Sequence, residues 1–443
     1  MRLKTLFSLL VSGTFLLTSC GNNKKDFSSY KENEVPYCYT YVSETSSGWN
    51  KVCNLNKIKT KNNIYVNPFD SDLIYASYPL NELEVETIYD IEHIMGKTFY
   101  DLHIDFDRHN DYVDSNNNII NNLKTINESY GTNKAIKVDD DLFNILKLGV
   151  QLGIDSNNLF NLAIGELSSF WDDLIAYNND RVSVSEYIDP LLDDEQSKEA
   201  KETLDKLKKE IPTAQELKEI LVFDDINKTV TFNKYKNVEK VSLSLGGIGK
   251  GYAVEKASLS LIDKKYDFGF ISGASSSNAM LGSRKDGTSW NIGISSPFKY
   301  DYDLGGYLKV KGYQNISTSG DTAHSYYLPI KDGDKDKYII RHHIIDPSTG
   351  ESKNNFRKVT LVSSSIPSSI MDALSTIMMN VEEKDLKDTI TFMRQKYGSL
   401  EGIFQKNNED ETIGYYYITK GLKDNFSLND ENSHSFEVSY YEF

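Results

Sequence analysis

Three short segments of this chain carry residue types and spacings that suit chemistry on a phosphorylated ligand. The first runs from Ser242 to Tyr252, where a β-type stretch meets the lysine-bearing turn Gly246-Gly247-Ile248-Gly249-Lys250-Gly251. Glycines allow close backbone approach and leave amide N–H groups above the following helix, where an anion binds readily. A Walker loop would need Gly in place of Ser244 and Ser or Thr in place of Gly251. The turn therefore predicts either a diphosphate cradle of another class or a tight strand-to-helix corner with a surface lysine.

The second segment, residues 368–379, is predicted to form a helix that begins just after Pro367. Asp372 and Thr376 are four positions apart, so a carboxylate and a hydroxyl lie on the same side of this helix. With a backbone carbonyl they could hold Mg²⁺, which prefers oxygen ligands and keeps positions open for substrate phosphates. The alternative is a helix cap, because Ser369 and Asp372 also fit the S-x-x-D capping-box pattern.

The third segment, residues 341–350, is predicted to be a strand that runs into a Pro-Gly turn and carries His342 and His343 side by side. Adjacent strand residues face opposite ways, so only one of the two can face a site. A histidine with a near-neutral pKa suits the work of a general base. The alternative is a partly exposed strand histidine without chemistry. Residues 161–165 and 318–321 are further polar or glycine turns.

Hydrophobic patterning predicts the helices and strands that carry these residues. Alternating apolar and polar residues between Tyr89 and Phe106, above all over 98–106, predict strands at the start of the folded body near Ile88. Helices are predicted over 139–152, 198–209 and 214–221, the last two separated at Pro212. Strand-like runs follow the glycine turn at 267–271, 290–294, 307–310, 338–345 and 358–362. The pattern favours an antiparallel sheet core with flanking helices.

The N-terminus reads as a lipoprotein signal peptide. Arg2 and Lys4 precede an apolar stretch from Leu6 to Leu17, and small residues then lead into Cys20. We expect residues 1–19 to be removed and Cys20 to be acylated, which anchors the chain in a membrane from its extracytoplasmic face. Residues 20–87 are then a lipid-anchored tether and N-terminal extension, and residues 88–443 form the main domain. No second hydrophobic segment is long enough to cross a bilayer.

Charge and cysteine usage narrow the class of partner. The 443 residues include 49 Lys and Arg against 65 Asp and Glu, a formal net charge of −16, and no basic stripe that would suit nucleic acid. A small phosphorylated ligand remains compatible, since a metal ion and a local lysine can neutralise a diphosphate inside an acidic protein.

Beyond Cys20 the only cysteines are Cys38 and Cys53, which an exported location permits to pair and which could equally be two free thiols.

Taken together, five segments in the same order resemble the ApbE-type family of FAD:protein FMN transferases. Residues 161–171 are similar to the family's D/N-P-T-V-G-P-L…LW segment, and residues 245–255 are similar to D-L-G-G-I-A-K-G-Y-A-V-D. Three shorter motifs follow: T-S-G-D at 318–321, H-I-I-D-P-x-T-G at 343–350 and D-A-L-A-T at 372–376. The match extends over about residues 88–420, and five ordered motifs are far more specific than any one of them.

The resemblance implies a fold and an activity. The family implies an α+β, T-fold-like architecture with a largely antiparallel sheet core, FAD as substrate and Mg²⁺ on its diphosphate. It also implies transfer of FMN to a Thr or Ser hydroxyl of another exported protein, with AMP leaving. Two alternatives stay open from the sequence: a Mg²⁺-dependent FAD pyrophosphatase that yields free FMN and AMP, and a non-catalytic flavin-binding surface lipoprotein.

The family's functional residues carry over by motif. Asp372, Thr376 and the carbonyl of Gly247 become metal ligands, Lys250 contacts FAD, and His343 becomes the base for the acceptor hydroxyl. Further flavin or nucleotide contacts fall on Met95, Ala163, Ile164, Gly165, Ser244, Ile344 and Ile345. Three departures are visible: Ser244 stands where the family usually has Asp, residues 273–277 stand where many members have a G-G-D or G-G-N turn, and Leu162-Ala163 replaces Pro-Thr.

Overall fold

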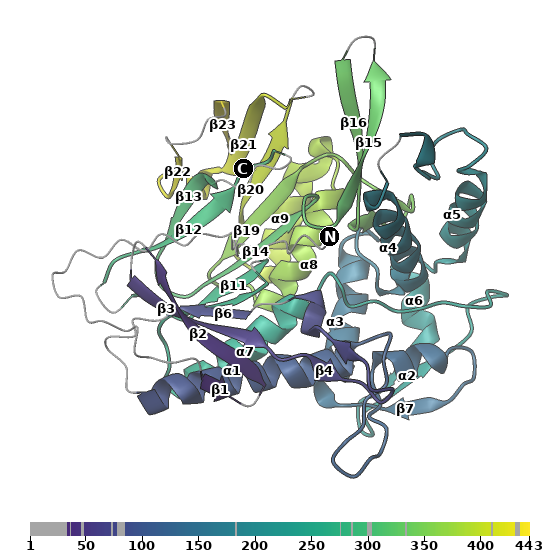
Figure 1. Cartoon of the computed structure of the whole chain (residues 1–443), viewed down its shortest axis with the longest axis horizontal. Coiled ribbons are helices and arrows are strands. Elements are labelled where there is room, and N and C mark those ends of the chain that lie inside the picture. The colour runs from purple at the N-terminus through teal and green to yellow at the C-terminus, as the bar shows by residue number, and fades with distance from the viewer. Residues whose placement is uncertain are drawn as a thin grey trace, which may run out of the picture.

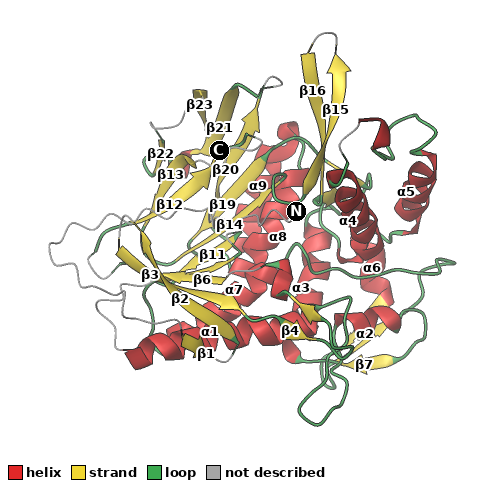
Figure 2. Ribbon diagram, viewed as in Figure 1, coloured by secondary structure: helices red, strands yellow, loops and turns green. Residues whose placement is uncertain are grey.

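A long, mostly antiparallel sheet crosses the structure, and helices pack against one of its faces (Figures 1 and 2). This computed structural model describes residues 33–443 except 36, 46–47, 72–73, 78–84, 182–183, 275, 285–286, 299–303, 333–334, 409–410 and 430–434. The combination of helices with an antiparallel-rich sheet confirms the predicted α+β class.

Among these residues the helices are α1 (Val85–Phe106), α2 (Leu123–Glu128), α3 (Asp140–Asp155), α4 (Gly165–Asn179), α5 (Lys198–Glu210), α6 (Ala214–Ile220), α7 (Gly249–Asp263), α8 (Ser368–Asn380) and α9 (Leu386–Tyr397). The strands of the large sheet, in spatial order, are β1 (Asn33–Val35), β2 (Cys38–Thr45), β3 (Gly48–Leu55), β6 (Ile74–Ser77), β10 (Phe270–Gly273), β11 (Ser277–Met280), β14 (Gln314–Gly320), β19 (Lys358–Ser363), β20 (Glu401–Asn407), β21 (Ile413–Thr419) and β23 (Ser435–Tyr441). The smaller sheets are formed by β12 (Trp290–Ser295), β13 (Leu304–Val310) and β22 (Phe426–Leu428), by β7 (Ala135–Lys137), β9 (Thr229–Phe232) and β8 (Leu221–Asp224), and by the pairs β4 (Ile58–Lys59) with β5 (Tyr65–Val66), β15 (Ser325–Asp332) with β16 (Lys335–His342), and β17 (Ile345–Asp346) with β18 (Glu351–Ser352). Neighbouring strands of the large sheet are antiparallel except β21 and β23, which are parallel.

The central strands of the large sheet, from β10 to β20, are buried on both faces, and their side chains alternate between two cores. One core lies on the side of α7 and α8 and takes Ile271, Ala279, Leu361 and Phe404. The other lies between the large sheet and the three-stranded sheet of β12, β13 and β22, and takes Phe270, Met280, Val362 and Ile403. Because successive strand residues point to opposite faces, apolar neighbours in the sequence serve different cores.

The strands predicted between Tyr89 and Phe106 are wrong, because α1 occupies this segment. Apolar residues alternate near the end of α1, but over its whole length they recur with the period of a helix. The apolar side chains that are at most 7% exposed are spaced three or four residues apart, which fits one face of a helix. They are Ile88, Ile91, Met95, Phe99, Leu102 and Phe106.

Other predicted elements are confirmed. Helix α3 begins after Asp139, whose side chain accepts a hydrogen bond from the Asp141 N–H, as expected for an N-cap. Helices α5 and α6 lie on either side of Pro212, and α8 begins directly after Pro367. The strand runs predicted after the glycine turn correspond, within a few residues, to β10, β12, β13, β16 to β17, and β19.

The N-terminal segment contributes more structure than its polar sequence indicates. Strands β1, β2, β3 and β6 extend the large sheet beyond β10, although no periodic apolar run marks them in the sequence. Cys38 and Cys53 form a disulfide across β2 and β3, which settles the alternative left open by the sequence. The predicted signal peptide and Cys20 lie outside the described residues.

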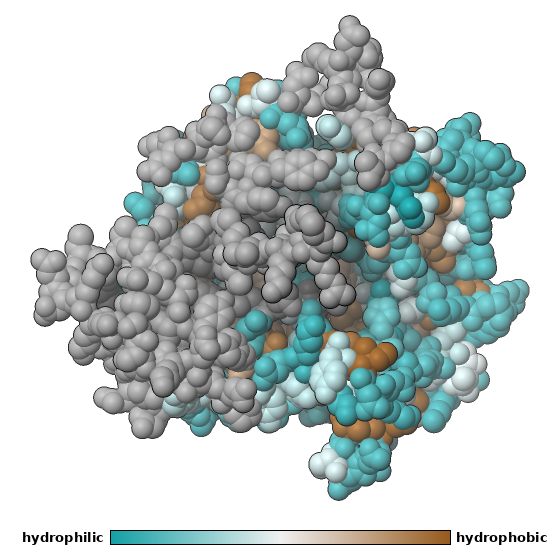
Figure 3. All heavy atoms as spheres, in the orientation of Figure 1, coloured by the Kyte–Doolittle hydropathy of each residue, from teal (hydrophilic) through white to brown (hydrophobic). Residues whose placement is uncertain are grey.

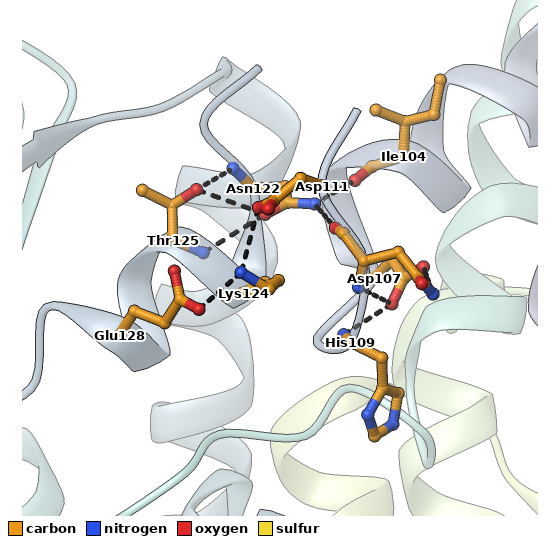
Figure 4. A network of polar contacts seen from close by, with 9 residues as sticks. Ile104, Asp107, His109, Asp111, Asn122, Lys124, Thr125 and Glu128 are labelled. Carbon is orange, nitrogen blue, oxygen red and sulfur yellow. Dashed lines mark hydrogen bonds and ion pairs between the residues drawn. The ribbon is translucent and has the colours of Figure 1, made fainter. Parts of the chain in front are cut away.

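A network of polar side chains fixes the turn between α1 and α2 (Figure 4). The Asn122 side-chain amide donates to the Ile104 carbonyl at 3.1 Å, and its oxygen accepts from the Thr125 N–H at 3.2 Å. The Lys124 ammonium bridges to Asp111 at 3.0 Å and to Glu128. Asn122 and Thr125 form a capping box at the start of α2, and the bond from Asn122 to Ile104 holds α2 against the end of α1.

The described surface in the view of Figure 3 is mostly hydrophilic, with apolar residues scattered in small groups. Within the part of the chain that the structure covers, no helix combines the length and apolar character needed to cross a membrane.

The disulfide closes a loop between residues separated by 15 positions, at the edge of the core beneath α1. We expect Cys53→Ser to lower the free energy of unfolding by about 3 kcal/mol, because the cross-link restricts the unfolded chain. Urea denaturation followed by circular dichroism measures the change. Reducing agent should destabilise the natural chain and leave the Cys53→Ser variant unaffected. Equal midpoints for the oxidised and reduced natural chain would contradict a stabilising role.

Candidate active site

The segment before the lysine-bearing turn is extended but is not the predicted strand, since it pairs with no neighbouring strand. Its backbone is held by loops and one helix instead. The Asn127 side chain of α2 accepts from the Leu243 N–H at 2.8 Å and donates to the Leu243 carbonyl at 3.1 Å. The Gly165 N–H donates to Ser242, and the Ser244 N–H donates to Leu162, both at 2.8 Å. Residues 161–165 and 242–250, predicted separately, therefore lie side by side.

The lysine-bearing turn ends where α7 begins at Gly249, and Lys250 is the second residue of that helix. Its N-cap residue, Ile248, offers no side-chain cap, and the first N–H groups bond elsewhere: Gly249 to the Leu245 carbonyl and Gly251 to the Asp372 carboxylate, both at 2.8 Å. A small hollow with a cavity volume of about 10 Å³, open toward solvent, lies beside Lys250, and Phe69, Phe99 and Ala274 are among its walls. An ammonium and a helix N-terminus next to an aromatic hollow suit an anion attached to a flat ring.

Phe69 was missed by the sequence analysis. It lies in a short 3₁₀ turn with a φ of 53°, and its N–H donates to the Nδ1 of His103 at 3.0 Å. The Phe69 ring meets the Phe99 ring edge to face at 5.8 Å. Only the tertiary structure brings this turn to Lys250, so no local signal marked it.

Helix α8 packs directly against the start of α7. The Gly251 N–H donates to the Asp372 carboxylate at 2.8 Å. A Cβ atom at Gly251 would lie 2.3 Å from the Ser368 carbonyl oxygen, so only glycine fits between the two helices. Asp372 is buried, and burial raises its pKa, while the Lys250 charge and the Gly251 N–H oppose that shift.

The three predicted metal ligands converge at this contact. Thr376 lies one turn after Asp372 on α8, and its hydroxyl oxygen would be 3.2 Å from a Cβ atom built on Gly247. Close by, the buried Ser277 hydroxyl lowers the pKa of Asp372 but makes no hydrogen bond of standard geometry among the described residues. A carboxylate, hydroxyls and a carbonyl form an all-oxygen donor set, which fits a hard cation such as Mg²⁺. Within the described ranges no group of three or more His, Cys, Asp or Glu side chains suits a metal.

The alternative capping box at Ser369 does not form. Its N–H donates to the Glu255 carboxylate at 3.1 Å, and its hydroxyl also donates to Glu255. The Asp372 side chain turns instead toward α7. The pairing of Ser369 with Glu255 thus frees Asp372 from a role in capping its own helix.

A layer of serine hydroxyls lies between β14 and α8. The Ser317 hydroxyl is 3.5 Å from the Asp372 carboxylate and 3.1 Å from the Ser375 hydroxyl, which is in turn 2.7 Å from Ser319. The spacing of Ser317 and Ser319 places both on one face of β14, a period-two signal that the sequence analysis did not use. The T-S-G-D segment, predicted to be a turn, is instead the end of strand β14, where Thr318 to Gly320 pair with β19. The hydroxyls on this strand connect it to the helix that carries Asp372.

The two adjacent histidines face different surroundings, although only His342 lies in a strand: β16 ends there, and His343 lies in the bend before β17. His342 is fully buried, with its Nε2 2.8 Å from the Lys353 carbonyl, and burial lowers its pKa to about 4. His343 is exposed, and its Nδ1 lies 3.1 Å from the His324 carbonyl. Since a carbonyl only accepts, Nδ1 carries the proton and Nε2 keeps a lone pair.

The surroundings of His343 keep its ring neutral. Although part of the side chain is open to solvent, the surrounding atoms desolvate the charged ring and lower the pKa of His343 to about 4. The charges of His342, Lys250 and His324 act in the same direction. Since Lys250 influences the pKa of both His343 and Asp372, its ammonium lies within electrostatic reach of both side chains.

The remaining predicted contacts are distributed unevenly. Ala163, Ile164 and Gly165 lie at the start of α4 beside Ser242, while Ile344 and Ile345 are buried. Ser244 accepts a hydrogen bond from the Gly246 N–H at 3.3 Å. Met95 is fully buried within α1 and is not brought to the hollow.

The family and structural comparisons agree with this arrangement. The model of the ApbE family matches residues 86–404, so the chain belongs to the ApbE family, as its five motifs predicted, and by that membership it is a transferase. Among curated proteins, none is similar enough in sequence to match.

Several solved structures are similar in fold. The ApbE protein of Thermotoga maritima has 20% identity and a TM-score of 0.56, covering 80% of this chain and 94% of its own. The flavin transferase ApbE of Vibrio cholerae has 14% identity and a TM-score of 0.51, with 87% and 98% covered. The flavinyl transferase ApbE of Pseudomonas stutzeri, in its apo form, has 15% identity and a TM-score of 0.50, with 88% and 94% covered. At these identities the likeness concerns the fold.

The tight contact between α7 and α8 is directly testable. We expect Gly251→Ala to lower the free energy of unfolding by about 1–3 kcal/mol, because the added methyl group would collide with the Ser368 carbonyl and push α8 away. Thermal or urea denaturation measures the loss. Gly246→Ala is the matched control, since its Cβ would meet only the Ser244 hydroxyl at 3.5 Å. Similar stability of the two variants would show that the helices are not in such close contact.

Proposed function

We propose that this transferase moves FMN from FAD to a Ser or Thr hydroxyl of an exported acceptor protein, with AMP as the leaving group. The observation that carries the proposal is the contact of Asp372 with the N-terminus of α7 beside Lys250, with His343 within electrostatic reach of that lysine. An anion site, an oxygen-ligand set and a neutral histidine are the groups that phosphoryl transfer to a hydroxyl requires.

Asp372, Thr376 and the Gly247 carbonyl would hold the divalent cation. Bound there, Mg²⁺ would neutralise charge on the FAD diphosphate. The buried Ser277 hydroxyl without a standard hydrogen bond supports an additional polar occupant near Asp372. The Lys250 ammonium and the amides at the start of α7 supply the remaining positive potential for the phosphates.

In the transfer step, the hydroxyl oxygen of the acceptor forms a bond to the FMN phosphorus, and the bond from that phosphorus to the bridging oxygen of AMP breaks. The proton of the hydroxyl passes to the Nε2 of His343, whose lone pair is free because Nδ1 donates to the His324 carbonyl. The exposed position of His343 supports a macromolecular acceptor, since a hydroxyl on a protein segment has to reach it from solvent.

FAD itself would bind over the surface at Lys250, where a small hollow is lined by Phe69 and Phe99. We place nucleotide or flavin contacts at Ser244 and at Ala163 to Gly165, which the backbone bonds to Ser242 and Ser244 bring next to the lysine-bearing turn. Met95 is left out of this proposal because its side chain is buried.

We further propose that the protein is a lipoprotein anchored through Cys20 on the extracytoplasmic face of the membrane. Its sequence supports this through the signal-peptide pattern of residues 1–19. The disulfide between Cys38 and Cys53 is an independent support, since such bonds persist in oxidising compartments outside the cytoplasm.

One labelling experiment tests the transfer. The full chain in detergent is incubated with FAD, Mg²⁺ and a peptide that carries Asp-x-x-Ser/Thr-Gly-Ala-Thr, and mass spectrometry then follows the peptide. We expect a gain of one FMN per peptide and release of AMP. Free FMN with unlabelled peptide would favour the pyrophosphatase, and unchanged FAD would favour the flavin binder.

Two variants separate binding from chemistry in this assay. Asp372→Asn should abolish turnover and weaken FAD binding, because it removes the charge that attracts the cation. His343→Gln should lower kcat by about 10²- to 10⁴-fold and spare FAD binding measured by flavin fluorescence. Transfer that survives His343→Gln would refute its role as the base.

The pH dependence follows from the depressed pKa of His343. A base acts only in its neutral form, so activity is retained above the pKa and is lost as the pH falls through about 4. We expect kcat/KM for transfer to stay level from pH 8 to about pH 5, whereas an ordinary histidine would lose half its activity near pH 6.5. An acid limb centred near pH 6.5 would contradict the environment described for this ring.

A further inference from the structure

The His324 backbone controls the orientation of the His343 ring. Its carbonyl oxygen accepts from both the His343 N–H and the His343 Nδ1–H, each at 3.1 Å. Two bonds to a single carbonyl fix the plane of the imidazole as well as its tautomer. Any movement of residue 324 would therefore be transmitted to the lone pair on Nε2.

The side chain of the same residue is held from another part of the fold. The His324 Nε2 lies 3.0 Å from the Asp172 carboxylate of α4, and Asp172 is also 3.7 Å from the Arg108 guanidinium. The His324 ring meets the His343 ring edge to face at a centroid distance of 5.6 Å. The carboxylate, the first histidine and the second histidine thus form one connected series.

A side-chain pair holds each end of the short connection from β14 to β15. At its start, Asp321 is buried and pairs with the buried Arg357 guanidinium, and the Asp321 N–H donates to the Arg357 carbonyl at 3.0 Å. At its end, His324 is held by Asp172. The pair of Asp321 and Arg357 is a buried ion pair with a structural role. The pair of His324 and Asp172 is half open to solvent, since 47% of the His324 side chain and 44% of the Asp172 side chain are exposed.

An exposed pair of this kind contributes little to folding stability, typically below about 1 kcal/mol. The position of this pair beside His343 therefore indicates its role better than its contribution to stability does. We propose that Asp172 and His324 are a positioning pair for His343: Asp172 holds the His324 side chain, and His324 holds the neighbouring base with its Nε2 toward the acceptor hydroxyl. The inference rests on the proposed function and names residues of that same site that its motifs do not include.

The test compares the natural full chain with His324→Ala, Asp172→Ala and the double variant. We expect each single variant to lower kcat for FMN transfer about tenfold, with the KM for FAD within about twofold, because a displaced base affects the chemical step and leaves ligand binding intact. The double variant should lose no more than either single variant, since the two residues act as a unit. Additive losses would overturn the proposal.

Two further variants show that the contact itself is responsible. Asp172→Asn keeps an oxygen that accepts from the His324 ring and should retain kcat within about threefold of the natural chain. Asp225→Ala is the matched control, because Asp225 also forms an exposed ion pair, with Lys147, far along the chain from this site. If Asp225→Ala lowered kcat as much as Asp172→Ala, the effect would be nonspecific and the proposal would fail.

A spectroscopic measurement separates this inference from the proposed function. ¹⁵N NMR of histidine-labelled full chain, with His343 assigned by the His343→Gln variant, reports which ring nitrogen carries the proton. We expect the Nδ1–H form in the natural chain and a mixture of both tautomers in His324→Ala. An unchanged His343 spectrum in His324→Ala would overturn the positioning role. Absence of transfer by the natural chain would instead refute the proposed function, and the tautomer measurement would still decide the inference.

Discussion

The contact between the start of α7 and the side of α8 is the constraint on which the rest of the site depends. The Gly251 N–H reaches the Asp372 carboxylate at 2.8 Å, and no side chain fits between the helices at residue 251. This close approach places a helix N-terminus, a lysine and a buried carboxylate within one small region. Each of these groups is unremarkable alone, and their proximity produces the strong local field that an anionic diphosphate and a cation require.

The burial of the Asp372 carboxylate opposes folding stability. A buried carboxylate costs free energy unless it is paired and hydrogen-bonded, and only the Gly251 N–H, nearby hydroxyls and the Lys250 charge offset the burial of Asp372. A core designed for stability alone would place an apolar side chain there. Sites at which folding and function disagree in this way are typical of ligand binding.

The site divides into a buried part and an exposed part with different tasks. Asp372 and the serine layer lie inside the sheet and helix interface, where water is excluded and charge interactions are strong. His343 and His324 lie at the surface, where a second protein can reach them. Lys250 connects the two parts electrostatically. This arrangement suits a reaction between an enclosed small substrate and a macromolecular acceptor.

The sequence by itself determined the elements whose signals are local. The helix after Pro367, the spacing of Asp372 and Thr376, and the lysine-bearing turn all depend on neighbouring residues, and the order of five motifs fixed the family. Only the tertiary structure decided what depends on distant partners. Alternating residues concealed the longer helical period of α1, and the stretch before the turn found side-chain and loop partners in place of a strand. Asp172 and His324 are 152 positions apart, so no local pattern could join them. Such contacts arise because chain folding, and not residue spacing, sets which surfaces meet.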